Sequence, residues 1–350
     1  SYSSPRWSPA GDRLAYIAEA GGKPQLFVRW METGETALVT NLVESPSAIA
    51  WSPDGQYLAF TMRVAAEKPS LAKPPKKPEG AEWAPEVKVI DSVVYRFDGR
   101  GYIDPGFEHV FVVPADGGSA RQLTTGDFDH SGPLAWTPDG GRIVFSANRS
   151  QDWQYERTER DLYAVAVATG ELEQLTDLPG IEQAPDVSPD GERIAFERDD
   201  HQGRQYSISK VAIMDIDGAN PEIVTGKLDR SAEEPRWAAD GAGIYFHFDD
   251  RGQRNVGYVT SDGAVRTVVE GLGGTTIGRP YLSGEFSVSH NDIVAYTAGS
   301  AKRPADLFVK QAEGDARRLT RLNENLLGHR DLAEVHEIVY ESDVDGTEIQ

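Results

Sequence analysis

Six residues in two polar segments have side chains that could bind a polar ligand. Four stand within seven positions of one another and two follow later: Arg96, Asp98, Arg100 and Tyr102, then Arg149 and Asp152. An arginine can bind a carboxylate or a carbonyl group through two parallel hydrogen bonds, and an aspartate can bind a free amine. These six are therefore the candidate binding residues. The alternative is that the arginines and aspartates pair with one another and only hold a solvated hairpin in shape.

No catalytic group is predicted within this chain. The nucleophile elbow of α/β hydrolases, Gly-x-Ser-x-Gly between a strand and a helix, does not occur in the sequence. The chain has no cysteine, which excludes thiol catalysis, and its seven histidines lack the spacing of paired metal ligands on a helix. We therefore predict no cofactor and no metal. A metal site assembled from distant segments is the alternative left open.

A short turn followed by an apolar strand recurs six times and indicates the fold class. The first residues of the six copies, at spacings of 44, 85, 51, 50 and 49, are Trp7, Trp51, Trp136, Val187, Trp237 and Phe286. The clearest copy, Trp51-Ser-Pro-Asp-Gly55, has proline and glycine where turns favour them. A repeat of roughly 45–50 residues with several short strands is typical of a β-propeller. We predict an all-β propeller with six four-stranded blades in this chain, beginning near residues 4, 48, 133, 184, 234 and 285.

The third repeat shows the four expected strands most clearly. They are Pro133–Trp136, Arg142–Ser146, Asp161–Val167 and Glu171–Thr176. The innermost strands are expected to line a central channel. A large aromatic residue at one fixed position of the repeat favours packing between neighbouring blades over a platform for a ligand.

The long step from Trp51 to Trp136 predicts an insertion arm in the second blade, at residues 63–108. Its first half, Glu67–Pro85, is rich in lysine and proline and is expected to be mobile or extended. Its second half, Val87–Tyr102, alternates apolar and polar residues and is expected to be ordered. The loops 148–153, 198–204 and 247–254 leave their blades at the equivalent point, so we expect the candidate residues on one rim with them.

The formal net charge of −21 argues against nucleic acid or an anionic membrane surface as a partner. No apolar run is long enough to span a bilayer. Because Ser1 is not a natural start, we expect that an N-terminal segment has been removed, and the missing signal peptide does not decide the location. The lack of cysteine fits a periplasmic or secreted protein, which we favour, and also a cytoplasmic one.

Five segments can be compared with those of known proteins: Ser4–Pro9, Tyr95–Tyr102, Val112–Gly118, Arg121–His130 and Phe145–Arg149. They resemble the propellers of the prolyl oligopeptidase (S9) family, in the branch of acylaminoacyl and dipeptidyl peptidases. The resemblance covers essentially the whole chain. It implies seven blades in the intact parent protein, followed by an α/β-hydrolase domain that carries a Ser-Asp-His triad. It also implies that the propeller admits short peptides and excludes folded proteins.

The resemblance supplies the predicted boundaries and partners. Residues 1–330 form the propeller, and residues 331–350 begin the linker and first hairpin of a hydrolase domain that this chain lacks. The predicted partners are that domain and short peptides, with a homo-oligomer left open, and the six candidate residues would border the shared cavity. The chain is then a substrate-gating and recognition domain without catalytic residues. The alternatives are a TolB-type propeller that binds proteins, against which the arm argues, and a metal-dependent sugar lyase, which needs several converging histidines.

Overall fold

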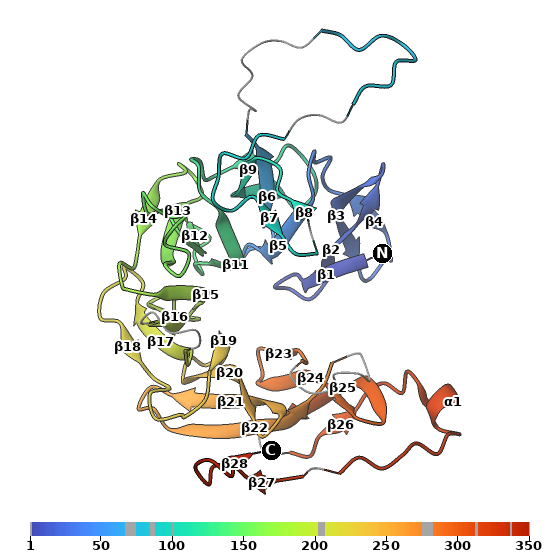
Figure 1. The fold of residues 1–350 in the computed structure, drawn as a ribbon, viewed down its shortest axis with the longest axis vertical. Coiled ribbons are helices and arrows are strands. Elements are labelled where there is room, and N and C mark those ends of the chain that lie inside the picture. The colour runs from blue at the N-terminus through green and yellow to red at the C-terminus, as the bar shows by residue number, and fades with distance from the viewer. Residues whose placement is uncertain are drawn as a thin grey trace. The chain divides into compact units, whose positions relative to one another are not determined.

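The computed structural model describes residues 2–66, 75–84, 88–99, 101–201, 207–274, 283–311, 314–336 and 338–349. They form six four-stranded antiparallel sheets, the blades of a β-propeller (Figure 1). The chain divides into two compact units, Ser1–Asp177 and Leu178–Gln350, with three blades in each. In the described ranges the single helix is α1 (Glu324–Leu327), and no helix is long and apolar enough to cross a membrane. The predicted fold class and the six blades are confirmed.

The first unit contains blades 1 to 3. Blade 1 consists of β1 (Tyr2–Trp7), β2 (Arg13–Ala20), β3 (Lys23–Trp30) and β4 (Thr36–Leu38). Blade 2 consists of β5 (Pro46–Trp51), β6 (Tyr57–Ala65), β9 (Gly106–Pro114) and β10 (Arg121–Gln122). Blade 3 consists of β11 (His130–Trp136), β12 (Arg142–Ala147), β13 (Asp161–Ala166) and β14 (Leu172–Gln174). β6 and β9 stay paired as far as Ala65 opposite Gly106, so the insertion leaves and re-enters blade 2 at these two residues.

The second unit contains blades 4 to 6. Blade 4 consists of β15 (Ile181–Val187), β16 (Arg193–Asp199), β17 (Lys210–Asp215) and β18 (Glu222–Ile223). Blade 5 consists of β19 (Glu233–Trp237), β20 (Gly243–Asp250), β21 (Gln253–Thr260) and β22 (Val265–Leu272). Blade 6 consists of β23 (Phe286–Val288), β24 (Ile293–Ser300), β25 (Arg303–Gln311) and β26 (Arg317–Arg318). A separate hairpin pairs β27 (Tyr340–Glu341) with β28 (Glu348–Ile349).

The repeated turn is held by its own polar side chains. In blade 2 the Ser52 hydroxyl donates to the Asp54 carboxylate at 2.6 Å and accepts the backbone N–H of Tyr57 at 2.9 Å. Gly55 takes a φ of 68°, which glycine adopts without steric cost. The same hydroxyl–carboxylate contact occurs at Thr137–Asp139 and Ser188–Asp190. The Ser-Pro-Asp-Gly pattern is therefore a turn with a local physical cause.

A buried threonine joins the outermost strand of a blade to its third strand. Thr124 and Thr225 each accept a backbone N–H, from Val110 at 3.0 Å and from Val211 at 2.9 Å. The same bond recurs in blades 1, 3 and 6, at Thr40, Thr176 and Thr320. The Leu-Thr or Val-Thr ending of the predicted outer strands thus fixes the short edge strand to its blade.

The tryptophans of the repeat connect neighbouring blades, as predicted. The indole N–H of Trp51 donates to the backbone carbonyl of Arg6 in blade 1 at 2.9 Å. Trp237 donates in the same way to Asp186 of blade 4 at 3.0 Å. The guanidinium of Arg13 also lies over the Trp51 ring, 4.9 Å from its centre. These rings are packing elements with their polar atom satisfied.

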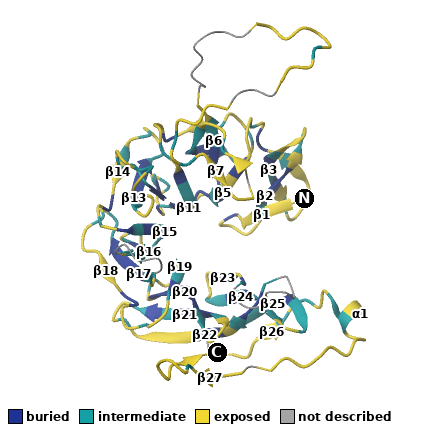
Figure 2. Ribbon diagram, viewed as in Figure 1, coloured by how far each residue is buried: buried dark blue, intermediate teal, exposed yellow. Residues whose placement is uncertain are grey.

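The core of the blades lies on their second and third strands. Four phenylalanines at the same place in the second strand are completely buried: Phe60, Phe145, Phe196 and Phe246. Burial of one such ring contributes about 1.5–3 kcal/mol. Figure 2 shows the buried residues inside the blades and the exposed residues along the described part of the insertion. Within each blade, the connection between the second and third strands therefore joins the two strands that carry the core.

Candidate functional site

The second half of the arm contains a two-stranded hairpin, in which the side chains of Arg96, Asp98 and Tyr102 are exposed. β7 (Arg96–Phe97) pairs with β8 (Gly101–Tyr102), and Ile103 donates its N–H to the Tyr95 carbonyl at 2.9 Å. The guanidinium of Arg96 lies 3.9 Å from the Asp98 carboxylate, and both side chains are exposed. The Lys88 ammonium lies over the Tyr102 ring at 4.1 Å.

Part of the arm lies outside the described residues. Arg100 and residues 67–74 and 85–87 belong to this part, so the expected mobility of Glu67–Pro85 stays a prediction there. The described residues 75–84 contain no strand or helix, and residues 88–102 contain the hairpin.

The arm contacts the connection between β12 and β13 of blade 3. The backbone N–H of Val93 donates to the side-chain carbonyl of Gln154 at 2.8 Å. At the base of the arm, the rings of Phe107 and Trp153 meet edge to face, with centroids 5.8 Å apart. The arm therefore contacts the connection that carries Arg149 and Asp152, but through residues that lie beside the six candidates and not through the candidates themselves.

Within this connection, Arg149 and Asp152 have different surroundings. Asp152 is exposed, and its backbone carbonyl accepts the N–H groups of Tyr155 at 2.8 Å and Glu156 at 3.0 Å, which makes it a turn residue. Arg149 is half-buried and points back toward the start of blade 3.

The partners of Arg149 are all neutral. Its Nη1 donates to the Thr125 carbonyl at 3.2 Å and lies 2.6 Å from Nε2 of His130. The guanidinium also lies over the Phe128 ring, 4.6 Å from its centre. Among the described residues, no acidic side chain lies within ion-pair distance of it. Burial lowers the pKa of Arg149, so an anionic or strongly polar ligand would stabilise its charge.

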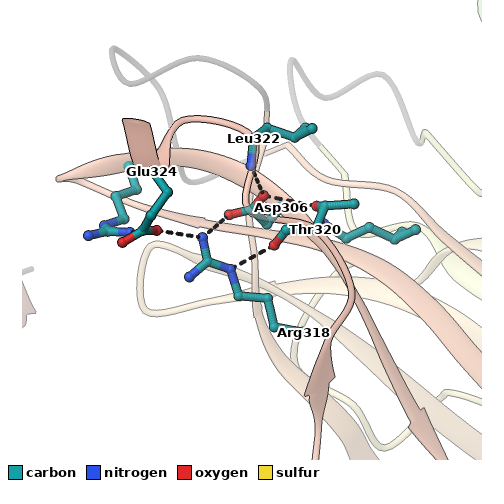
Figure 3. Close-up of polar contacts among 7 residues, drawn as sticks. Asp306, Arg318, Thr320, Leu322 and Glu324 are labelled. Atoms are coloured by element: carbon teal, nitrogen blue, oxygen red, sulfur yellow. Dashed lines mark hydrogen bonds and ion pairs between the residues drawn. The ribbon is translucent and has the colours of Figure 1, made fainter. Parts of the chain in front are cut away.

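Several other arginines in the described part of the chain are paired with carboxylates. In blade 3, Arg142 lies 3.0 Å from Glu173. Figure 3 shows such a pairing in blade 6, where Arg318 contacts both Asp306 and Glu324. Arg303 also contacts Glu324, at 2.6 Å. Asp306 and Glu324 neutralise these two cations, whereas the charge of Arg149 stays uncompensated.

His130 is the residue of this site to which the sequence analysis assigned no role. It is completely buried at the start of β11, and its Nδ1 lies 3.0 Å from the Glu108 carbonyl. The Glu108 carboxylate is held in turn by the hydroxyls of Ser47, at 2.8 Å, and Thr61. Burial lowers the pKa of His130 to about 4, so its ring is neutral at pH 7. In the sequence analysis, Asp129 and His130 appear only at the end of the segment Arg121–His130, one of those that resemble the S9 propellers.

The described residues contain no group of three or more histidine, aspartate or glutamate side chains that could hold a metal ion. The connections of the second unit carry ion pairs instead. Arg254 of blade 5 binds Asp249 at 3.0 Å and lies 3.4 Å from Glu233. Residues 202–206 of the corresponding blade 4 loop lie outside the described ranges.

Comparison with known proteins points to peptidases. Residues 101–195 match the model of the dipeptidyl peptidase IV (DPP IV) N-terminal region. The chain is 26% identical over 355 residues to the uncharacterized peptidase YuxL of Bacillus subtilis, covering 97% of this chain and 52% of that protein. It is 24% identical over 343 residues to dipeptidyl-peptidase 5 of Porphyromonas gingivalis, covering 93% and 47% respectively.

The fold of the chain is also similar to that of a solved peptidase structure. The acylaminoacyl peptidase of Pyrococcus horikoshii matches with a TM-score of 0.74 and 20% identity, over 99% of this chain and 49% of that one. The chain thus spans about half the length of the curated relatives it matches. The predicted resemblance to the propellers of acylaminoacyl and dipeptidyl peptidases is confirmed.

Proposed function

We propose that this propeller, which is related to those of acylaminoacyl and dipeptidyl peptidases, recognises and gates substrates for a serine peptidase that cleaves short peptides. The proposed partner is an α/β-hydrolase domain of the parent protein, because the relatives are about twice as long as this chain. The hairpin β27–β28 is the proposed beginning of that domain. The chain itself contributes recognition, since it contains no nucleophile elbow.

The observation that carries the proposal is Arg149, a half-buried cation whose contacts among the described residues are with neutral groups. The side chain is already oriented by these contacts, so little rotamer entropy is lost when a ligand binds. A peptide carboxylate or carbonyl group could bind its remaining N–H groups through two parallel hydrogen bonds. Hydrogen bonds to a charged group contribute about 1.5–3 kcal/mol each.

The arm supplies the second part of the proposed site. It contacts the same connection that carries Arg149, through Val93 and Gln154. Arg96, Asp98 and Tyr102 lie on its exposed hairpin and are proposed to contact the peptide, with Asp98 available to an amine. Arg100 and Asp152 complete the proposed set.

Replacing Arg149 by alanine in the full-length parent tests the proposal. We expect KM for a short peptide to rise, or kcat/KM to fall, by roughly tenfold or more, because a desolvated charged hydrogen bond is lost. Arg142→Ala is the matched control, since Arg142 is a blade 3 arginine already paired with Glu173. Kinetics within twofold of wild type for Arg149→Ala, with an unchanged unfolding midpoint, would remove Arg149 from the binding site.

The same assay tests the arm. Alanine at Arg96 or Asp98 should also raise KM by roughly tenfold if these side chains bind the peptide. An exposed ion pair contributes only about 0–1 kcal/mol to stability, so the fold should tolerate both changes. An unchanged KM for both variants would show that the pair only shapes the hairpin.

A further inference from the structure

We infer that His130 is a positioning residue, which holds the guanidinium of Arg149 in its binding orientation without cancelling its charge. The inference rests on the proposed role of Arg149. His130 begins β11, and Arg149 follows β12 by two residues. His130 pairs with Ala147 across these strands, and this register brings the two side chains together.

The two ring nitrogens of His130 have different partners. Nδ1 lies 3.0 Å from the Glu108 carbonyl, which can only accept a hydrogen bond, so Nδ1 carries the proton. Nε2 then has a free lone pair, and it accepts the N–H of Arg149 at 2.6 Å. The backbone of β9 thus selects the tautomer that can hold an arginine.

A neutral acceptor has a different effect on Arg149 from that of a carboxylate. Asp306 and Glu324 also hold the side chain of Arg318 in place, but their carboxylates neutralise its charge (Figure 3). The imidazole fixes one end of the guanidinium and leaves the full positive charge for a ligand. The Thr125 carbonyl acts in the same way on the same Nη1.

Burial keeps the His130 ring neutral, and two of its charged or titratable neighbours add to this effect. His109 of β9 lies beside it, with ring centroids 5.1 Å apart, and Phe145 of β12 meets it edge to face at 5.5 Å. Asp129, the neighbour of His130 in the sequence, accepts the backbone N–H of Glu108 at 2.8 Å. A proton on Nε2 of His130 would face the Arg149 cation at hydrogen-bond distance. Burial, with His109 and Arg149 as further causes, lowers the pKa of His130.

Three substitutions at His130 in the full-length parent separate orientation from charge. His130→Gln places an amide oxygen near the position of Nε2, and KM should stay within about twofold of wild type. His130→Phe keeps a ring but removes the acceptor, and KM should rise about tenfold. His130→Glu supplies an acceptor with a negative charge, and KM should rise at least as much because Arg149 is then neutralised.

The Arg149→Ala background distinguishes the two proposals. If Arg149→Ala alone leaves KM unchanged, the proposed function of Arg149 fails. If Arg149→Ala raises KM, the effect of His130→Phe is compared in the wild-type and the Arg149→Ala backgrounds. An equal rise of KM in both backgrounds would mean that the two residues act independently, and the positioning role of His130 would be refuted. We expect no further increase from His130→Phe once Arg149 is absent.

A measurement on the chain itself does not depend on activity. Side-chain ¹⁵N NMR should show His130 with a protonated Nδ1 and an unprotonated Nε2 from pH 7 down to at least pH 5. In Arg149→Ala the Nε2 resonance should shift, because it loses a hydrogen bond to a cation. The opposite tautomer, or an unchanged Nε2 resonance in Arg149→Ala, would overturn the inference even if a His130 variant fails to fold.

Discussion

At the scale of single residues, the arginines of this protein differ in what balances their charge. The guanidinium groups of Arg318 and Arg303 form ion pairs with carboxylates, which neutralise their charge. The guanidinium of Arg149 instead contacts an imidazole, a backbone carbonyl and the face of an aromatic ring. In a chain with a net charge of −21, acidic groups are plentiful, yet no acidic side chain of the described residues lies within ion-pair distance of the half-buried Arg149.

Two buried histidines give the fold a dependence on pH. Burial lowers the pKa of His130 to about 4 and that of His247 to about 3, against the ordinary value of 6.5. The Glu234 carboxylate, 3.7 Å from His247 Nδ1, is half-exposed and does not offset this burial. Between pH 6.5 and about 4 the unfolded chain therefore binds protons that the folded chain does not. The free energy of unfolding must fall as the pH drops through this window.

The variant His247→Leu isolates one of these contributions. Both ring nitrogens of His247 lack a hydrogen-bond partner among the described residues, so leucine breaks no bond there. From pH 7 to pH 5, urea unfolding should show a loss of stability smaller than that of wild type by about 1–2 kcal/mol. Equal losses in the two proteins would show that His247 titrates normally in the fold.

At the scale of elements, a threonine hydrogen bond that recurs with the repeat holds the outer strand in blades 1, 2, 3, 4 and 6. Thr225 is completely buried and accepts the Val211 N–H at 2.9 Å. Thr225→Val has nearly the same shape but leaves that N–H unpaired, so stability should fall by about 1–3 kcal/mol in urea unfolding. Thr267→Val on the exposed face of β22 is the control and should be close to neutral. A neutral Thr225→Val would mean that the threonine bond contributes nothing to closing the blade.

The strands could be predicted from the sequence because their causes are local. Ser52, Asp54 and Gly55 build a turn within six residues, and apolar alternation follows directly.

The role of His130 could not be predicted in the same way. The innermost strand of blade 3 was expected to start at Pro133, whereas β11 starts at His130. The pairing of His130 with Ala147, which places Arg149 beside the ring, was therefore missed. The contact between Val93 and Gln154 joins residues 61 positions apart, and no sequence pattern encodes it.

At the scale of the whole molecule, the chain is a scaffold of six blades with one insertion, and the proposed chemistry belongs to the parent protein. The chain ending at Gln350 should not hydrolyse chromogenic peptides, because it contains no nucleophile elbow. The parent should hydrolyse them and should lose this activity after treatment with a serine-directed covalent inhibitor. Turnover by the chain alone that the same inhibitor abolishes would contradict the proposed division of roles.

The most direct test of the central claim is a crystal structure of the full-length parent with a short peptide inhibitor bound. The account predicts a carboxylate or carbonyl oxygen of the peptide within about 3 Å of the Arg149 guanidinium. The imidazole of His130 should remain on the other side, with Nδ1 directed at the Glu108 carbonyl. A carboxylate of the parent's own hydrolase domain in that position, with the peptide bound elsewhere, would show that Arg149 holds the two domains together and does not recognise substrate.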